Sequence, residues 1–186
     1  MSRSLIRRLA GDESGVSAVE FALIAPVMLL FYAGMVDLCQ GYMALKRTSH
    51  AASAVADLVS QSRTITKADI NSIFEVGPAI MAPFASTSME QRISSVTRVS
   101  ANKYTLNWSR SWTPDGGAGT KMNKPLVIAD AGIPADMFPA DGDSIIVAEA
   151  YYKYSSPFQQ FLPAAEFTRR AYLNPREATV ITCSDC

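Results

Sequence analysis

The sequence predicts an α+β fold in which a long N-terminal helix carries a small antiparallel β-sheet head. The first observation is an apolar run from Val16 to Val36 that contains a single charged residue, Glu20. The second is a proline-free stretch, residues 37–62, whose apolar positions recur at helical spacing. The third is a series of alternating segments, clearest over Ile145–Tyr154, which is typical of strands. Together they indicate one long helix followed by a head in which strands cover its outer half.

The composition excludes several classes of function. The chain has 17 basic and 17 acidic residues and no net charge, whereas a nucleic-acid-binding protein needs a basic surplus to displace counterions. His50 is the single histidine, which argues against a histidine-based triad or a multi-histidine metal site. The 3 cysteines are too few for a disulfide scaffold and lack zinc-finger spacing. We therefore predict no enzyme activity, no cofactor, no metal and no nucleic-acid partner.

The apolar run is long enough to cross a membrane. A helix over residues 16–36 would span about 30 Å, the thickness of the hydrocarbon core of a bilayer. Arg3, Arg7 and Arg8 precede the run, and the basic side of a first apolar segment stays in the cytoplasm. The sequence thus predicts a single-pass protein of the bacterial inner membrane, in contact with membrane lipid. Its N-terminus would be cytoplasmic and its head periplasmic.

Two kinds of leader removal fit poorly at the outer end of this run. Residues 32–40 contain no small-x-small pattern for an ordinary signal peptidase, and the run is longer than the roughly 7–15 residues of an ordinary signal. Leu38 precedes Cys39, where a lipoprotein site needs a small residue. On these grounds an uncleaved anchor is favoured over ordinary cleavage. A different possibility lies at the inner end, where Gly15 precedes the run and Glu20 follows five residues later.

The stretch Gly15-Val16-Ser17-Ala18-Val19-Glu20-Phe21 resembles the processing site of type IV pilins and pseudopilins. The resemblance implies that a membrane prepilin peptidase cuts after Gly15, so that Val16 becomes the new N-terminus. It also implies that Glu20 pairs with the N-terminal amine of a neighbouring subunit, with Phe21 beside it in the assembly site.

Electrostatics gives this pairing a physical reason. An unpaired carboxylate in hydrocarbon costs several kcal/mol. Cleavage would create an α-ammonium on Val16, and opposite charges about 4 Å apart attract by roughly 4 kcal/mol at an effective dielectric constant of 20, before desolvation. The alternative is that Glu20 lies at the membrane edge and reaches the headgroups. The glycine, the spacing, Phe21 and the basic leader favour processing.

The wider segment SAVEFALIAPVMLLFYAGMVDL resembles the N-terminus of TadE-like proteins, the pseudopilins of tight-adherence (Flp-type, type IVb) pilus systems. The shared features are Val19–Leu23, a proline inside the apolar helix at Pro26, and an acidic residue, Asp37, at its outer end. The resemblance is specific over about residues 14–60 and leaves TadE versus TadF open. It implies a pilin-like fold and a pseudopilin or minor pilin that assembles with other pilins and the pilus assembly machinery, in the inner membrane or the extracellular pilus.

These features divide the chain into four predicted parts. They are a cytoplasmic leader (1–15), a transmembrane helix (16–36), a continuing amphipathic spine helix (37–62) and a periplasmic α+β head (63–186). The competing hypothesis is an uncleaved, single-pass membrane-anchored binding or adhesion module. Pro26 either bends the transmembrane helix for packing or is simply tolerated there.

The spine helix should bury one face, and His50 on it should be an exposed or interface residue. The apolar positions at i, i+3/i+4 spacing are Leu38, Tyr42, Leu45, Ala52, Val55, Ala56 and Val59.

The head should begin with a short helix and continue as a meander of strands. Thr66 and Asp69 have capping-box spacing, and the helix that they begin should end near Gly77-Pro78. Tyr104, Leu106 and Trp108 alternate with polar residues and should share one face. The expected strands are residues 92–99, 104–108, 145–154, 167–173 and 178–182, with a flexible loop over 113–125 and an apolar loop over 158–163.

The remaining motifs receive structural interpretations. Cys183 and Cys186 form a C-x-x-C motif, for which we predict a local disulfide in an oxidising periplasm, since no helix follows to activate a thiol. Cys39 would stay free or pair between subunits. The acidic stretch 130–143 lacks the residue order of a calcium loop and is predicted to form turns.

Overall fold

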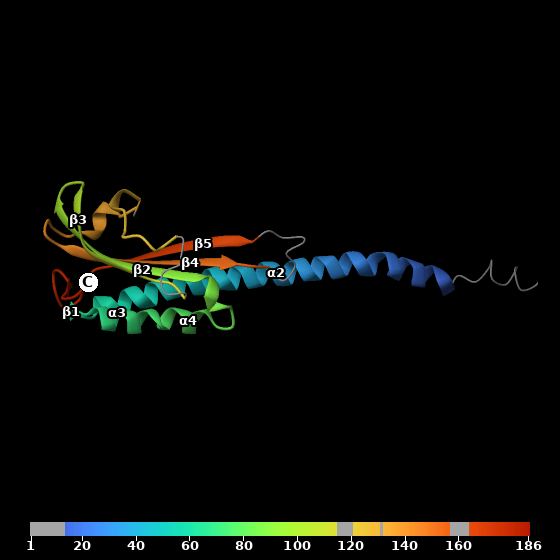
Figure 1. Ribbon diagram of the computed structural model, residues 1–186. Helices are drawn as coiled ribbons and strands as arrows, with labels where there is room; N and C mark the ends of the chain where they lie inside the picture. Colours follow the sequence, from blue (N-terminus) through green and yellow to red (C-terminus); the bar gives the residue numbers. More distant parts are fainter. Residues whose placement is uncertain (1–13, 115–120, 131, 157–163) are drawn as a thin grey trace, which may run out of the picture. The chain divides into compact units, whose positions relative to one another are not determined.

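The computed structural model describes residues 14–114, 121–130, 132–156 and 164–186 (Figure 1). The chain divides into two units, residues 1–40 and 41–186. The described part of the first unit is helical, and the second combines helices with an antiparallel four-stranded sheet. The predicted α+β class is therefore confirmed. Most of the predicted leader, residues 1–13, and the predicted apolar loop up to residue 163 lie outside the described residues.

A single long helix, α2 (Ser14–Ser60), contains both the predicted membrane segment and the predicted spine. It continues past Pro26 and ends at Ser60, slightly before the predicted end at residue 62. The Arg176 backbone N–H donates to the Ser60 carbonyl at 2.8 Å, and this satisfies one of the carbonyls that a helix end leaves without a partner. The prediction that the apolar run continues into the spine as one helix is confirmed.

Within the second unit, α2 packs on the sheet through small side chains. Tyr42 is exposed and Leu45 is only half-buried, so the first half of the predicted stripe is wrong. Alanines lie at the contact instead, because they let a helix backbone approach a sheet more closely than leucine or tyrosine does. The buried positions on this part of the helix are Ala44, Thr48, Ala51, Ala52, Val55, Ala56, Val59 and Ser60.

Two short helices follow, α3 (Lys67–Phe74) and α4 (Val76–Met81). The predicted capping box begins α3: the Asp69 N–H donates to the Thr66 hydroxyl at 3.2 Å, and the Thr66 N–H donates to the Asp69 carboxylate at 3.0 Å. The predicted helix end near Gly77-Pro78 is wrong, because both residues lie in the first turn of α4. Proline is tolerated there, since the first N–H groups of a helix have no partner within it.

The capping box should make the stability of the head depend on pH. Hydrogen bonds from the side chain and backbone of Thr66 lower the pKa of Asp69 below its ordinary value of 3.8. A lowered folded-state pKa means that the stabilisation is fully present above the unfolded pKa and is lost as the pH falls through the folded pKa. At pH 7 the wild type should therefore melt at a higher temperature than Asp69→Asn, and the difference should shrink below pH 3.8. Circular dichroism melts at several pH values test this, and a difference independent of pH would contradict it.

The sheet contains four antiparallel strands, β2 (Met89–Ser100), β3 (Lys103–Trp112), β4 (Ser144–Tyr154) and β5 (Ala165–Leu173). Their spatial order is β3-β2-β4-β5 (Figure 1). The predicted meander is therefore wrong: β2 and β3 form a hairpin, but β4 pairs with β2 rather than with β3. The connection between β3 and β4 is long enough to carry the chain across to the other edge of β2.

A smaller pairing joins β1 (Thr64–Ile65) to β6 (Thr182–Cys183), and the two run parallel. Residues 178–181, which the alternating pattern predicted as part of a last strand, form no strand. The Ile181 carbonyl instead accepts a hydrogen bond from the Trp108 indole at 2.8 Å. This carbonyl is therefore bonded to a side chain rather than to a neighbouring strand.

A β-bulge in the hairpin reverses the predicted facing of Trp108. Val96 pairs with Leu106, but Ser95 pairs with Trp108, which leaves Asn107 as an extra residue. Trp108 consequently packs in the core beside α2, whereas Leu106 packs on the opposite face of the sheet. The prediction that Leu106 and Trp108 share one face is therefore wrong, because the alternation of residues along one strand does not reveal a bulge.

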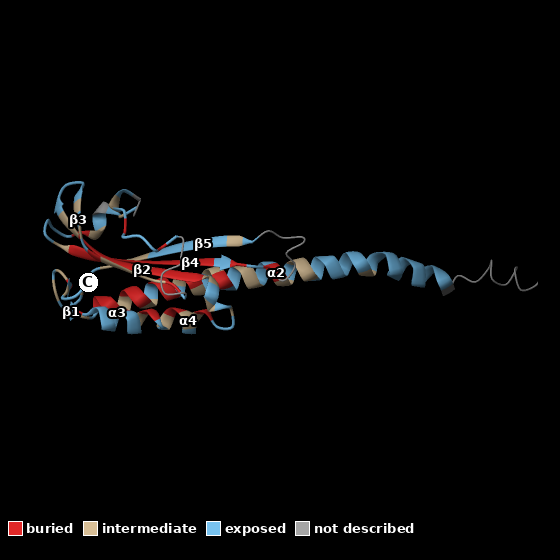
Figure 2. Ribbon diagram, in the orientation of Figure 1, coloured by how far each residue is buried: buried red, intermediate tan, exposed pale blue. Residues whose placement is uncertain are grey.

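Strand β4 follows its predicted alternation. Ile146, Ala148 and Ala150 pack towards α2, and Val147 packs on the outer face of the sheet. Figure 2 shows the buried residues in red along β2, β4 and the adjoining part of α2. The outer face also holds a buried charge, Glu149, which is 2% exposed.

The Glu149 carboxylate lies between two arginines from the neighbouring strands. It accepts hydrogen bonds from the Nε of Arg92 in β2 and from the Nε of Arg170 in β5, each at 2.6 Å. This ion-pair group joins three strands on the outer face of the sheet.

Candidate assembly helix

Gly15, Val16 and Glu20 lie in the first turns of α2, which begins at Ser14. Val16 and Glu20 are four residues apart, so they lie on one face of the helix, about 6 Å apart along its axis. Both are exposed, and Glu20 makes no hydrogen bond or ion pair with the residues that the structure describes. Within these residues, the packing of the chain leaves this carboxylate without a partner.

The packing of its own helix does not require Gly15. A Cβ built on this glycine meets nothing within 4 Å, and the residue does not have a positive φ. The described structure therefore gives no packing or backbone reason for a glycine at this position.

The helix from Val16 to Val36 is apolar on every side. Phe21 and Phe31 are each 73% exposed, and none of residues 15–36 is buried. The segment lies in a candidate membrane span, Gly15–Ser60, whose most apolar window has a mean hydropathy of 2.0. Its length and composition suffice for one crossing of a bilayer, and such a surface is stable only under apolar cover.

Pro26 lies within this apolar surface. It has no N–H to donate to the carbonyl of Ala22, one turn earlier in the helix. Transmembrane helices tolerate this loss, because neighbouring helices or local adjustments satisfy the carbonyl. The predicted bend at Pro26 stays a prediction.

The model of the TadE-like protein family matches residues 15–57. This segment is TadE-like. The match begins at Gly15, includes Glu20, Phe21 and Pro26, and reaches almost to the end of α2. The resemblance noted in the sequence is therefore confirmed over this range. No curated protein and no solved structure matches the chain.

The TadE-like segment agrees with a pilin of a tight-adherence system, and the TadE-like pilins are a structural family rather than a family of enzymes. A pilus family of this kind implies interaction with other pilus components. The apolar helix within the segment supports membrane anchoring.

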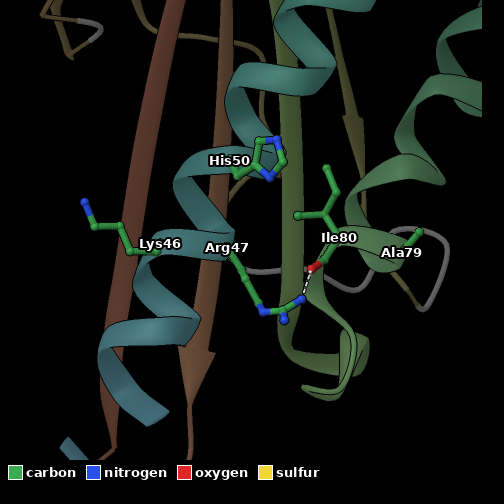
Figure 3. Close-up of a pocket in the computed structure, with 5 residues that line it drawn as sticks. All are labelled: Lys46, Arg47, His50, Ala79 and Ile80. Carbon is green, nitrogen blue, oxygen red and sulfur yellow. Dashed lines mark hydrogen bonds between the residues drawn. The ribbon is translucent and has the colours of Figure 1, made fainter. Parts of the chain in front are cut away.

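His50 lies in the part of the TadE-like segment that packs in the second unit. Figure 3 shows it beside a groove between α2 and α4, together with Arg47 and Ile80. The Arg47 guanidinium donates to the Ile80 carbonyl at 2.8 Å and also to the Ala82 carbonyl, so it holds α4 in place. Lys46 and Ala79 complete the lining, and neither is a nucleophile paired with His50. The exposure predicted for His50 is confirmed.

Cys183 and Cys186 are joined by a disulfide. Between them, the Asp185 carboxylate accepts from the backbone N–H of Lys67 at 2.7 Å, at the start of α3. The disulfide therefore belongs to a turn that docks on the N-terminus of a helix, where an anion is favourable. Cys39 is exposed and not disulfide-bonded.

The sequence interpretation did not single out two charged residues of the head. Glu149 alternates with apolar residues in β4, as an ordinary solvent-facing strand residue does. Arg110 lies between Trp108 and Trp112 at strand spacing, in the pattern W-S-R-S-W. The sequence could have indicated Arg110, because a charged residue at a strand position that faces the core is unusual unless it has a partner.

Proposed function

We propose that the chain is a pseudopilin or minor pilin that takes part in assembling a tight-adherence type IVb pilus, and that a prepilin peptidase processes it after Gly15. One observation supports this above all. The TadE-like match begins at Gly15, on an exposed apolar helix whose single charged residue before Val36 is Glu20, one turn beyond Val16.

Processing would change the charge at the start of the helix. Hydrolysis of the Gly15–Val16 peptide bond leaves an α-ammonium group on Val16. A helix N-terminus already carries a partial positive charge, so a cation placed there is destabilised and a nearby carboxylate is favoured. In hydrocarbon this preference is stronger, because neither charge is solvated by water.

The useful partner for this ammonium is the Glu20 carboxylate of a neighbouring subunit. A pair within one chain would neutralise both charges but would not connect two subunits. A pair between chains sets the axial offset of two apolar helices, which otherwise slide freely because lipid-facing contacts are nondirectional. Phe21 follows Glu20 and offers apolar contact beside the pair. Subunits would then be added in one register.

The proposed orientation places the leader in the cytoplasm and the head in the periplasm. Arg3, Arg7 and Arg8 favour a cytoplasmic N-terminus. The Cys183–Cys186 disulfide agrees with an oxidising compartment for the head.

Intact-mass analysis of the protein recovered from membranes tests processing. In cells with a prepilin peptidase, the wild-type mass should correspond to loss of Met1–Gly15. Gly15→Leu should be recovered at full length, because the proposal places the cut directly after this glycine. Gly11→Leu is the matched control, since it alters another glycine of the same leader and should still be processed.

Full-length wild-type protein in such cells would contradict the proposal. It would support the competing hypothesis of an uncleaved anchor that carries a periplasmic binding or adhesion module. Processing of Gly15→Leu at the wild-type position would equally exclude Gly15 as the recognised residue.

A further inference from the structure

A cavity opens between α3 and the C-terminal end of β3, within the second unit. Its volume is about 480 Å³, which falls in the range of small-molecule sites in proteins. Asn71 comes from α3, Glu75 from the link to α4, and Arg110 and Trp112 from β3. Thr113 and Asn123 contribute from the chain that follows β3. Most of these lining residues are polar, whereas small-molecule sites are usually lined by apolar side chains.

Arg110 lies on the face of β3 that points towards the helices. It pairs with Ile93, and both Ile93 and Trp108 belong to the core cluster beside α2. Trp112, two residues beyond Arg110, packs against the same cluster. The strand therefore directs a guanidinium inward between two tryptophans, a position that strand periodicity would normally give to an apolar residue.

Two of the lining residues each have a buried polar atom without a hydrogen-bond partner among the residues that the structure describes, the Nε of Arg110 and the Oγ1 of Thr113. Thr113 is 7% exposed, and Arg110 makes no ion pair with any residue that the structure describes. Leaving a buried donor unpaired costs free energy, which an acceptor brought by a ligand would restore. Both atoms can donate, so the missing partner is an oxygen acceptor.

The charges of the cavity indicate which acceptor fits. A guanidinium binds a carboxylate or a phosphate through parallel N–H groups. Among the lining side chains that the structure describes, Arg110 is the one cation, and Glu75 adds a negative charge. Glu75 repels a doubly charged phosphate about twice as strongly as it repels a carboxylate of single charge, whereas Arg110 can bind either through its N–H groups. A carboxylate is therefore favoured.

The remaining lining indicates the rest of the ligand. The Asn71 amide and the Glu75 carboxylate can exchange hydrogen bonds with hydroxyl groups, and the Trp112 ring offers an apolar face. Hydroxyls on one side and an apolar ring face on the other are the surface of a sugar. We propose that this cavity binds an acidic sugar of the uronic acid class, with its carboxylate on Arg110 and Thr113. This site is separate from the assembly helix and does not depend on processing.

Isothermal titration calorimetry of the full chain in detergent micelles tests the proposal, with glucuronate as the probe. Glucuronate should bind saturably, and glucose, which lacks the carboxylate, at least tenfold more weakly. Arg110→Leu should weaken glucuronate binding at least tenfold. Thr113→Val keeps the shape of the side chain without its hydroxyl and should weaken binding severalfold, which provides a second variant if Arg110→Leu misfolds.

Arg169→Leu is the matched control. Arg169 lies between Phe167 and Ala171, so it shares the helix-facing side of the opposite edge strand, but it is exposed and outside the cavity. Its loss should leave glucuronate affinity unchanged. Absence of saturable binding at tens of millimolar glucuronate would overturn the proposal. So would equal weakening by Arg169→Leu, or equally strong binding of an acidic dipeptide, which would assign the cavity to peptides rather than to sugars.

Discussion

Replacing Glu20 with alanine should abolish pilus assembly while leaving membrane insertion and processing after Gly15 intact. Alanine makes the apolar helix more hydrophobic, so insertion is not impaired. Assembly loses the carboxylate partner of the Val16 ammonium, an attraction of roughly 4 kcal/mol before desolvation. Since each 1.4 kcal/mol is a factor of ten, subunit association should fall by up to about a thousandfold. Electron microscopy of pili, with membrane fractionation and intact mass of the same cells, measures all three steps.

Matched substitutions separate charge from shape at this position. Glu20→Gln keeps the size and hydrogen-bonding capacity of the side chain but removes its charge, and it should fail as Glu20→Ala does. Glu20→Asp keeps the charge on a shorter side chain and should retain part of the piliation. Glu177→Ala removes an exposed glutamate of the head that pairs with Arg63, and it should assemble normally. Normal piliation of Glu20→Ala would exclude the pairing mechanism, although processing after Gly15 could still hold.

Removing the carboxylate of Glu149 should have the largest effect on the stability of the head. Glu149→Ala leaves the guanidiniums of Arg92 and Arg170 on the outer face of the sheet without their common anion. Removing one partner of a buried ion pair lowers the free energy of unfolding by about 3–5 kcal/mol, because the remaining charge is still desolvated. The Arg92 side chain is 11% exposed, so water can solvate its unpaired charge only poorly. The melting temperature of the full chain in detergent should fall by on the order of 10 °C.

An exposed glutamate on the neighbouring strand provides the control. Glu166 in β5 pairs with Lys121 at 3.0 Å, and its side chain is 46% exposed. Surface pairs of this kind contribute about 0–1 kcal/mol, so Glu166→Ala should hardly change the melting temperature. The double variant Glu149→Met with Arg92→Met should be more stable than Glu149→Ala, since it leaves fewer buried charges uncompensated. Equal melting of Glu149→Ala and Glu166→Ala would contradict this account.

Local patterns were enough to predict the long helix, the capping box and the existence of four main strands. Each of these depends on residues that are close in the chain. The apolar run and the spine share one helical period, Thr66 and Asp69 are three residues apart, and β4 alternates over its whole length. The candidate assembly site was predicted from the resemblance of Gly15-Val16-Ser17-Ala18-Val19-Glu20-Phe21 to a pilin processing site, which is also a short local pattern.

Strand pairing, the bulge and the buried charges depend instead on which segments, distant in the sequence, pack against each other. Nothing near β4 in the chain shows that it pairs with β2, and the extra residue Asn107 is visible only when both strands of the hairpin are aligned. Helix α2 buries alanines rather than Tyr42 because the sheet, not the helix, sets the depth of the contact. Glu149 forms ion pairs with two arginines only after β2, β4 and β5 have packed together. In the same way, Arg110 is left without an ion-pair partner among the described residues only once the segments around it have packed. Periodicity acts over a few residues, whereas register, burial and charge pairing are set by packing between segments that the chain separates by tens of residues.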